Sequence, residues 1–405
     1  MADDDGNSDG LRKRDLYRLP WSLNDNPIGW VEITDLCNIS CRGCYRTALA
    51  GHKSFEDIRT EILFLQEWRN ISNVHLAGGE PLVHPDVVEI VRLIRDRGLN
   101  PVIITNGHRL TRELLIRLRD AGLGEMSFHI DSGQTRPGWT GRNEVELNGL
   151  RQHYADLLWD VGGVTCNFNM TVNPRTVATV PEVIRWALGT RGKVSGLTLI
   201  TLRGFPRQGI EFVEGGKVID LNAPSIGMVN DVEDELSTLR SDDLYRMISG
   251  TFPGYEAASY LGGTKTVSSF KWLIANAICC NEDLVGSVSP TTVEIAQTVH
   301  HLRYGRYYAG GRGRVGKMIL LMAAVDRRIR RVVMGLLRRP GRLFGRIYTL
   351  TISVIEPNTL LPDGEVEMCD SCPDMTYHEG RLVHSCRLDE YRMYGTLVKP
   401  VVTAD

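Results

Sequence analysis

The first half of the chain alternates between short apolar runs and amphipathic stretches. Six apolar runs have the length of buried strands, and they cover residues 29–33, 73–77, 101–105, 125–130, 164–172 and 194–201. Helical periodicity lies between them, over residues 56–68, 85–97, 112–121, 144–156 and 180–189. This alternation with short loops predicts parallel strands joined by right-handed crossovers. The pattern therefore predicts an α/β fold, either an open sheet or a partial (β/α)6 barrel.

The pattern changes after about residue 205. Polar turns follow, with a helical stretch over 233–248 and an apolar run over 270–278 that we expect to be a helix. Residues 291–346 have helical periodicity, and 348–354 have the pattern of a strand. We therefore expect four regions, which are a disordered tail (1–24), a core (25–205), a mixed and mainly helical region (206–346) and a cysteine-rich region (347–405).

Composition narrows the class of protein. The chain has 405 residues, a net charge of −2 and 42% hydrophobic residues, which is typical of a globular protein. It has no apolar run of about 18 residues that could span a bilayer, and its acidic start lacks the apolar core of a signal peptide. Nine cysteines without a secretion signal favour metal binding over disulfides. We therefore expect a cytoplasmic protein.

Three cysteines, Cys37, Cys41 and Cys44, follow the first predicted strand with the spacing C-x3-C-x2-C. We call this segment the cysteine loop. Thiolates are the ligands of iron–sulfur clusters, and three of them leave one of four irons open to another ligand. The alternative is zinc, which prefers four protein ligands. The next cysteine, Cys166, is distant and more typical of a buried apolar position.

The cysteine loop resembles that of the radical S-adenosylmethionine (radical SAM) superfamily. A second motif, Gly78-Gly79-Glu80-Pro81, follows the second strand and strengthens the resemblance. The family usually has an aromatic residue before its third cysteine, whereas this chain has Gly43 there and Tyr45 just after. The resemblance implies a partial barrel, a [4Fe–4S] cluster that binds S-adenosylmethionine (SAM), and an electron donor such as flavodoxin or ferredoxin.

The resemblance also implies roles for residues at the strand ends. Glu80, with its neighbours in the motif, is expected to bind the amino group of SAM, and Tyr45 to lie near the adenine. Asn106 follows the third strand, where it is either a turn residue or part of the SAM site. Asp131 and Ser132 follow the fourth strand, a position that often contacts ribose hydroxyls in the family. Alternating asparagines on the fifth strand are expected to line the barrel interior.

A second cysteine group lies near the C-terminus. Cys369, Cys372 and Cys386, which we call the tail triad, have the spacing C-x2-C-x13-C. This spacing matches the second cluster site of the GTP cyclase of molybdopterin synthesis and is loosely similar to SPASM and twitch domains. The resemblance implies a second [4Fe–4S] cluster, with zinc as the alternative. We expect Cys279 as a fourth ligand and Cys280 as a free thiol that donates a hydrogen atom, unless both are buried apolar residues.

Residues 310–346 contain eleven Lys or Arg and one acidic residue. An apolar stripe with helical spacing runs through this segment, and it consists of Ile329, Val332, Val333, Leu336 and Leu337. Such a helix either packs on the core or lies on an anionic membrane surface. No aromatic interleaving accompanies the charge, so nucleic acid is not expected as a partner.

The resemblance implies reductive cleavage of SAM and hydrogen abstraction from an unactivated carbon. The stretch from Cys372 to Tyr391 looks like that of a group containing archaeal tetraether-lipid synthases, which together with the basic helix makes a lipid the first expectation for the substrate. A small polar substrate or a peptide is the alternative. A cluster-binding redox sensor or scaffold without turnover is the non-enzymatic alternative.

Overall fold

The computed structural model describes residues 11–46, 51–202, 210–219, 239–310, 316–361 and 363–402. All six strands predicted in the first half are present, and consecutive ones are parallel neighbours in one sheet. They are β2 (Ile28–Thr34), β4 (Asn73–Gly78), β5 (Asn100–Thr105), β6 (Glu125–His129), β8 (Thr165–Val172) and β9 (Gly196–Thr201). This sequential order is the one expected of a partial barrel, because a doubly wound sheet reverses its order part-way.

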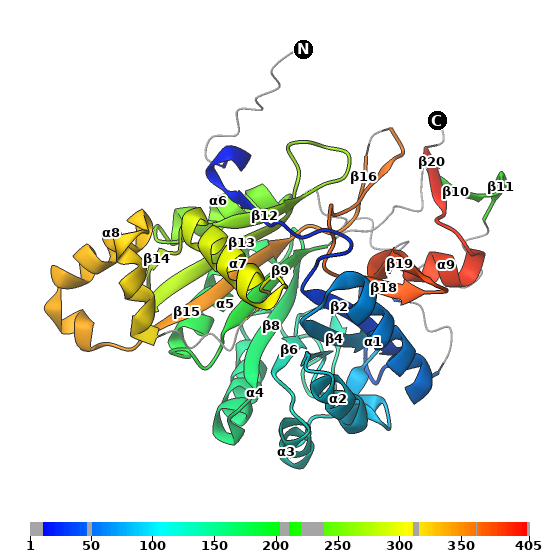
Figure 1. The fold of residues 1–405 in the computed structure, drawn as a ribbon, viewed down its shortest axis with the longest axis horizontal. Helices are drawn as coiled ribbons and strands as arrows, with labels where there is room; N and C mark the ends of the chain where they lie inside the picture. Colours follow the sequence, from blue (N-terminus) through cyan, green and yellow to red (C-terminus); the bar gives the residue numbers. More distant parts are fainter. Residues whose placement is uncertain are drawn as a thin grey trace.

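The five helices predicted between these strands are also present. They are α1 (Phe55–Arg69), α2 (Val87–Asp96), α3 (Arg112–Asp120), α4 (Asn148–Val161) and α5 (Val180–Gly189). A side-chain cap starts two of them, since the hydroxyls of Ser54 and Thr111 accept backbone hydrogen bonds in the first turns of α1 and α3. Figure 1 shows α1 to α4 on the outer side of the strands. The inner side of the sheet is thereby left for a ligand.

Strands from the second half of the chain extend this sheet. Strand β15 (Ile347–Ile355) pairs parallel to β9, and β13 (Phe270–Cys280) pairs antiparallel to β15. Strands β12 (Ser259–Gly262), β14 (Asp283–Ser287) and β1 (Tyr17–Arg18) complete an 11-stranded mixed sheet. The α/β class is confirmed, but the mainly helical extension is not, because the second half also supplies strands to the sheet of the core.

Two local predictions are also wrong. Residues 270–278, expected to be helical, belong to β13, because a continuous apolar run does not distinguish a helix from a strand buried on both faces. Residues 11–24, expected to be disordered, are structured, since β1 pairs with β12. The rest of that predicted tail, residues 1–10, lies outside the described residues.

The helices of the second half are α6 (Ser241–Thr251), α7 (Pro290–Tyr304) and α8 (Arg327–Leu337), with 3-10 helices η5 (Gly316–Ala324) and η6 (Pro340–Phe344). The helix predicted over 233–248 corresponds to α6, although its first six positions lie outside the described residues. Within the described residues, no helix is both long and apolar enough to cross a bilayer.

The C-terminal region folds back against the first strand of the core. The hairpin of β18 (Met375–His378) and β19 (Arg381–His384) lies beside β2 and α1, and α9 (Leu388–Tyr394) follows it (Figure 1). The remaining short elements are η1 (Lys13–Asp15), β3 (Ser40–Cys41), η2 (Pro81–Val83), β7 (Gln134–Thr135), η3 (Val177–Thr179), β10 (Ile210–Glu214), β11 (Lys217–Val218), β16 (Thr359–Leu360), β17 (Val366–Glu367), η7 (Ser385–Arg387) and β20 (Lys399–Val402). This arrangement brings the tail next to the strand that precedes the cysteine loop.

Candidate functional site

The predicted site residues follow strands that end at one edge of the sheet. The cysteine loop follows β2, the Gly-Gly-Glu-Pro motif spans the end of β4, Asn106 follows β5, and Asp131 follows β6. These four strands are parallel, so their carboxyl ends meet at the same edge. That edge is where α/β barrels and sheets bind their ligands.

The two glycines of the motif hold the start of the cysteine loop. Gly79 N–H donates to the Thr34 carbonyl (2.7 Å), and Glu80 N–H donates to the Leu36 carbonyl (2.8 Å). A Cβ atom at Gly79 would lie 2.3 Å from the Leu36 oxygen. At Gly78, where φ is +121°, a Cβ atom would lie 2.2 Å from the Thr34 oxygen. Both positions therefore require glycine, because the backbone of the motif approaches the backbone of residues 34–36 too closely for a side chain.

A short strand pair holds the middle of the loop. Strand β3 pairs antiparallel to β7, with Cys41 opposite Gln134. Arg42 N–H donates to the Gly133 carbonyl (2.8 Å) next to this pair. Because β7 follows the end of β6, the pairing ties the cysteine loop to the strand that leads to Asp131.

The three thiols of the loop influence one another. Burial is the main cause that raises the pKa of Cys41, and the charges of Asp131, Cys44 and Cys37 raise it further. Burial also raises the pKa of Cys44, with a smaller contribution from Cys37. Three thiolates here need nearby positive charge, which the irons of a cluster supply, so the donor set fits an iron–sulfur cluster. Within the described residues, no three Cys, His, Asp or Glu side chains converge on a single metal-ion position.

Glu80 is completely buried, and its carboxylate joins the ends of β4 and β5. Oε1 accepts hydrogen bonds from the Thr105 hydroxyl (2.5 Å) and Leu82 N–H (3.0 Å), and Oε2 accepts one from Asn106 N–H (2.7 Å). Burial raises the pKa of Glu80, and these bonds oppose the rise. Pro81, also buried, starts η2 directly after it. Glu80 forms no ion pair with any described residue, so the ammonium group of a ligand would meet an unpaired carboxylate.

Asn106 contacts the cysteine loop directly. Its Nδ2 donates to Asn38 Oδ1 (2.8 Å) and to Cys37 Sγ (3.7 Å). Its Oδ1 accepts a hydrogen bond from His108 N–H (2.8 Å), which is the turn role expected of an asparagine after a strand. The turn role expected of Asn106 is therefore confirmed, whereas its place in the SAM site remains a prediction.

The Asp131 carboxylate is already engaged by the protein. Its Oδ2 lies 2.7 Å from His129 Nε2, and its Oδ1 accepts a hydrogen bond from Gly133 N–H (3.0 Å). Burial tends to raise the pKa of Asp131, but His129 and Thr171 outweigh it and lower the pKa to about 2. The neighbouring Ser132 is half-buried, and its predicted contact with ribose remains a prediction, as does that of Asp131.

Tyr45 packs toward the C-terminal part of the molecule. Its ring joins an apolar cluster around Phe212 and Val398. Burial raises the pKa of Tyr45, with a further contribution from the nearby Glu32 carboxylate. The ring is thus held by protein contacts, and its predicted proximity to an adenine remains a prediction.

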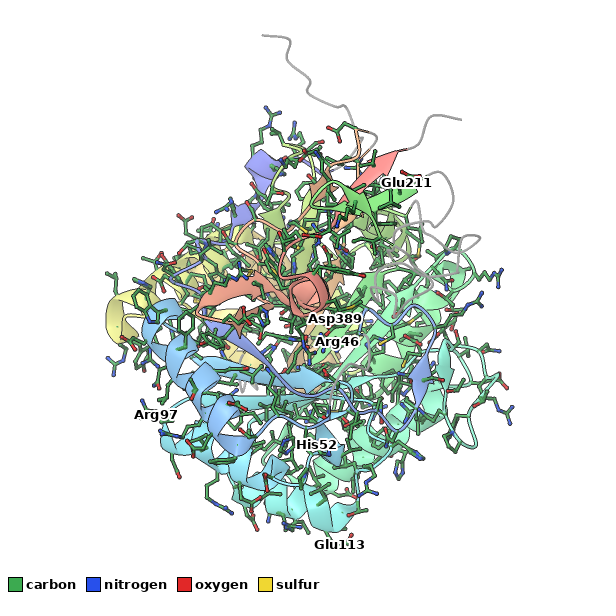
Figure 2. All side chains as sticks on the ribbon, turned by 90° about the vertical axis from the view of Figure 1, so that its right-hand side faces the viewer. Arg46, His52, Arg97, Glu113, Glu211 and Asp389 are labelled. Carbon is green, nitrogen blue, oxygen red and sulfur yellow. The ribbon has the colours of Figure 1, made fainter. Side chains whose placement is uncertain are left out.

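An ion-pair network that the sequence did not predict holds the end of the loop. Arg46, two residues after the last loop cysteine, contacts Glu32 (2.7 Å), Asp35 (2.6 Å) and Asp389 (2.7 Å). Arg392 contacts Asp35 as well, at 2.6 Å. The Arg46 side chain is only 5% exposed, and Figure 2 shows it facing Asp389 of α9. The C-terminal helix is therefore bound to the segment that carries the cysteine loop.

Within the tail triad, Cys369 and Cys372 are in contact, and Cys386 lies within range of the charge of Cys369. The Cys369 thiol hydrogen-bonds to Cys372, which together with burial raises the pKa of Cys372. Burial and then the charge of Cys369 raise the pKa of Cys386. The guanidinium of Arg69, which is completely buried, donates to the Cys372 carbonyl (2.5 Å) and so fastens the triad to α1. Three sulfur donors suit the predicted second cluster, and they suit zinc as well.

Cys279 and Cys280 do not join the tail triad. They end β13, where Cys280 pairs with Ile347, whereas Trp272 near the start of the strand packs against the triad. Eight residues of strand separate Trp272 from Cys280, or about 26 Å at 3.3 Å per residue. Cys279 packs in the main core, and Cys280 Sγ donates to the Arg342 carbonyl (3.4 Å). The assignments of Cys279 as a ligand and Cys280 as a hydrogen donor are therefore corrected, because both lie at the opposite edge of the sheet.

The inner side of the sheet carries polar residues. Along β8 the alternate positions Thr165, Asn167, Asn169 and Thr171 are partly exposed, whereas the positions between them are buried against the helices. Asn169 Oδ1 accepts a hydrogen bond from the Ser127 hydroxyl of β6 (3.0 Å). The prediction that alternating asparagines line the barrel interior agrees with this pattern.

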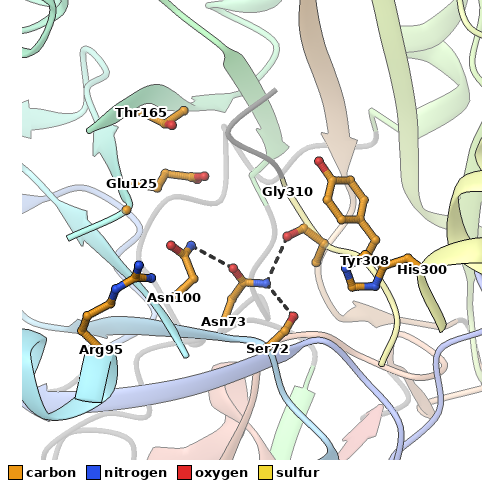
Figure 3. A pocket seen from close by; sticks show the side chains of 11 residues that line it. Ser72, Asn73, Arg95, Asn100, Glu125, Thr165, His300, Tyr308 and Gly310 are labelled. Atoms are coloured by element: carbon orange, nitrogen blue, oxygen red, sulfur yellow. Dashed lines mark hydrogen bonds between the residues drawn. The ribbon is translucent and has the colours of Figure 1, made fainter. Parts of the chain in front are cut away.

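A cavity of about 410 Å³ lies at the other edge of the sheet, at the amino ends of β4, β5, β6 and β8 (Figure 3). Asn73 lies between Asn100 and Ser72 in its wall and forms hydrogen bonds with both, at 2.9 and 3.0 Å. Burial raises the pKa of Glu125, which also lines the cavity, to about 7. Because this cavity is at the amino ends of the strands, it is not part of the site built around the cysteine loop.

Comparison with known proteins agrees with a site at the edge of the sheet that carries the cysteine loop. The family model of the radical SAM superfamily matches residues 31–186, which run from β2 into α5. Residues 31–186 are therefore similar to a radical SAM domain. This family uses a [4Fe–4S] cluster together with SAM. The radical SAM match covers the cysteine loop, the Gly-Gly-Glu-Pro motif and the strand ends at Asn106 and Asp131.

Several curated proteins are similar to part of this chain. The AdoMet-dependent heme synthase of Methanosarcina barkeri is 39% identical over 169 residues, which cover 40% of this chain and 46% of that protein. A probable GTP 3′,8-cyclase of Methanothermobacter marburgensis is 34% identical over 25% of this chain and 34% of that protein. The 7,8-dihydro-6-hydroxymethylpterin dimethyltransferase of Methanocaldococcus jannaschii is 32% identical over 28% of this chain and 24% of that protein. The chain spans less than half the length of these relatives.

Among solved structures, Streptococcus suis SuiB bound to S-adenosylmethionine has a TM-score of 0.40 and 13% sequence identity. The alignment covers 57% of this chain and 48% of that one.

Proposed function

We propose that this chain is a radical SAM enzyme that abstracts hydrogen from a polar substrate. The observation that carries the proposal is the convergence of the cysteine loop, Glu80 and Asn106 at the carboxyl edge of a parallel sheet. The family match supports the same conclusion, because it covers all of these residues.

Cys37, Cys41 and Cys44 are the proposed ligands of the first cluster. A [4Fe–4S] cluster bound there supplies the electron that cleaves SAM to methionine and a 5′-deoxyadenosyl radical, which removes a hydrogen atom from the substrate. The loop is held by the backbone hydrogen bonds of Gly79 and Glu80, by the pairing of β3 with β7 and by the ion pairs of Arg46. A reduced flavodoxin or ferredoxin is the expected electron donor.

Glu80 and Asn106 are proposed to form the wall that binds SAM. The buried Glu80 carboxylate lacks a charged partner among the described residues, which suits a ligand ammonium group. Its three hydrogen bonds with the protein hold it in position, so its orientation does not depend on the ligand. Asp131 and Ser132 are the proposed ribose contacts, with Asp131 ionised at neutral pH because its pKa is lowered to about 2.

Of the two substrate classes expected from the sequence, the inner wall favours the polar one. Asn167, Asn169 and Thr171 present amides and a hydroxyl where a lipid chain would need apolar contacts. The names of the relatives point the same way, since they refer to heme, GTP and a pterin. A lipid substrate remains the second candidate, with a charged surface described below as the only structural feature in its favour within the described residues.

The tail triad is proposed to hold a second [4Fe–4S] cluster. Its thiols are gathered beside β2, and Arg69 and Asp389 connect this region to the core. With Cys279 and Cys280 excluded, three cysteines remain as ligands of the second site. A cluster there would leave one iron for another ligand.

Anaerobic reconstitution followed by a SAM cleavage assay tests the proposal. The wild-type protein should release 5′-deoxyadenosine after reduction, and the variant with all three loop cysteines replaced by Ala should release none and lose one cluster. Production of 5′-deoxyadenosine by that variant would show that the cluster assignment is wrong. A wild type that binds both clusters but never cleaves SAM would identify the scaffold or sensor alternative. Deuterated candidate substrates then identify the substrate class through deuterium transfer into 5′-deoxyadenosine.

A further inference from the structure

One end of the sheet carries a lobe with exposed apolar side chains. We define the basic lobe as residues 316–346, which contain η5, α8 and η6. Its exposed large apolar residues are Met318, Leu321, Val325, Met334, Leu337 and Phe344. Two of them are almost free of protein contact, since Leu321 is 75% and Phe344 is 90% exposed. Figure 1 shows α8 at the outer end of the sheet, beyond β14.

Apart from Leu337, these residues do not belong to the apolar stripe predicted from the sequence. In that stripe Ile329, Val332 and Leu336 are buried, so the core-facing alternative describes α8. Arg328 and Arg331 form ion pairs with Glu256 and help to fasten the helix. The exposed apolar residues are distributed over η5 and η6 as well as α8.

The charge of the lobe differs in sign from that of the rest of the chain. The lobe contains nine Lys or Arg and one acid, whereas the whole chain has a net charge of −2, so the remainder is strongly negative. The single acid, Asp326, is buried and accepts hydrogen bonds from Ser289 N–H, Ile329 N–H and the Thr292 hydroxyl. Arg338 and Arg339 are exposed and form no ion pair with any described residue. The lobe is therefore cationic as well as apolar.

We propose that the basic lobe docks on an anionic membrane surface, independently of the proposed function. Leu321 and Phe344 would enter the headgroup region, and Arg338 and Arg339 would contact lipid phosphates. Exposed apolar and cationic groups on one lobe match an anionic lipid bilayer, which binds both kinds of group favourably. A nucleic acid would interact favourably with the cationic groups alone, and two copies of this lobe would repel each other. The negative remainder of the chain would orient the molecule with this lobe toward the membrane.

Vesicle sedimentation with the full-length protein tests the proposal. The wild type should bind vesicles of phosphatidylglycerol mixed with phosphatidylcholine, should not bind vesicles of phosphatidylcholine alone, and should dissociate as salt is added. The Arg338→Gln/Arg339→Gln variant should bind about 30-fold more weakly, at about five-fold per arginine. The Leu321→Ser/Phe344→Ser variant should lose at least ten-fold, because it removes the inserted apolar groups.

Two control variants remove side chains of the same kinds outside the basic lobe. Leu302→Ser removes an apolar side chain that is 81% exposed on α7, and Arg112→Gln/Arg117→Gln removes exposed cations on α3. Both should bind anionic vesicles like the wild type. All variants change exposed residues, and an unchanged melting temperature confirms that each is folded.

Four outcomes would overturn the proposal. The wild type could fail to bind anionic vesicles at low salt, or it could bind neutral vesicles equally well. The control variants could lose as much binding as the lobe variants. The fourth outcome is weak vesicle binding together with evidence of another partner. That evidence would be either tighter binding to RNA, which the Leu321→Ser/Phe344→Ser variant leaves unchanged, or a dimer in light scattering, which this variant abolishes.

Discussion

Replacing Arg46 by Gln should weaken the fold and loosen the cysteine loop. Arg46 joins Glu32, Asp35 and Asp389 at 2.6–2.7 Å in a buried site. In the variant, Arg392 still pairs with Asp35 and stays 3.6 Å from Asp389, but Glu32 loses its ion pair. Removing one partner of a buried ion pair costs about 3–5 kcal/mol. We expect a loss of this size in the free energy of unfolding of the apoprotein.

The loss should depend on pH. Burial raises the pKa of Glu32 in the folded protein, and Arg46 opposes that rise. Without Arg46 the folded-state pKa rises further, so the folded protein retains a proton that the unfolded chain releases above about pH 4.3. Stability then falls as the pH rises through the interval between these two pKa values. The destabilisation by Arg46→Gln should therefore be larger at about pH 8 than at about pH 5.5.

Urea unfolding followed by circular dichroism measures the loss, and the alkylation rate of Cys44 in the native protein measures the order of the loop. Arg387→Gln is the matched control, because its pair with Glu390 is equally buried but lies within the C-terminal segment. The control should lower stability without accelerating alkylation of Cys44, whereas Arg46→Gln should do both. A loss below about 1 kcal/mol for Arg46→Gln, or equal acceleration in both variants, would refute the idea that this network holds the loop.

Three further predictions concern the site. Glu80→Gln should weaken SAM binding about ten- to a hundred-fold with the iron content unchanged, because a charge-assisted hydrogen bond contributes about 1.5–3 kcal/mol; equilibrium dialysis measures the affinity, and loss of iron would instead assign Glu80 a structural role. Gly79→Ala should lower both thermal stability and iron content, since its Cβ would lie 2.3 Å from a backbone oxygen, whereas Gly189→Ala, which meets no atom within 4 Å, should lower neither. Replacing the tail triad by Ser should halve an iron content of about eight per chain, and zinc in place of that iron would contradict the second cluster.

Periodicity and local motifs were sufficient for the first half of the fold. The six parallel strands and their helices follow from alternating apolar patterns, because each pattern is set within about a dozen residues. The placement of the site followed as well, since motifs after successive parallel strands must meet at one edge. The order of the motifs therefore predicts that the cysteine loop, Glu80, Asn106 and Asp131 lie at the same edge of the sheet.

The sequence by itself thus determined the α/β core, the cysteine loop and the chemistry that its sulfur atoms allow. Only the tertiary structure decided that residues 270–280 form a strand, because an apolar run buried on both faces lacks the periodicity that distinguishes a strand from a helix. It also separated Cys279 and Cys280 from the tail triad, since their position depends on the pairing of β13 with β15. Arg46 and Asp389 are 343 residues apart, and no local pattern links them. Such contacts arise from how the C-terminal segment packs on the sheet, which is a property of the whole folded chain.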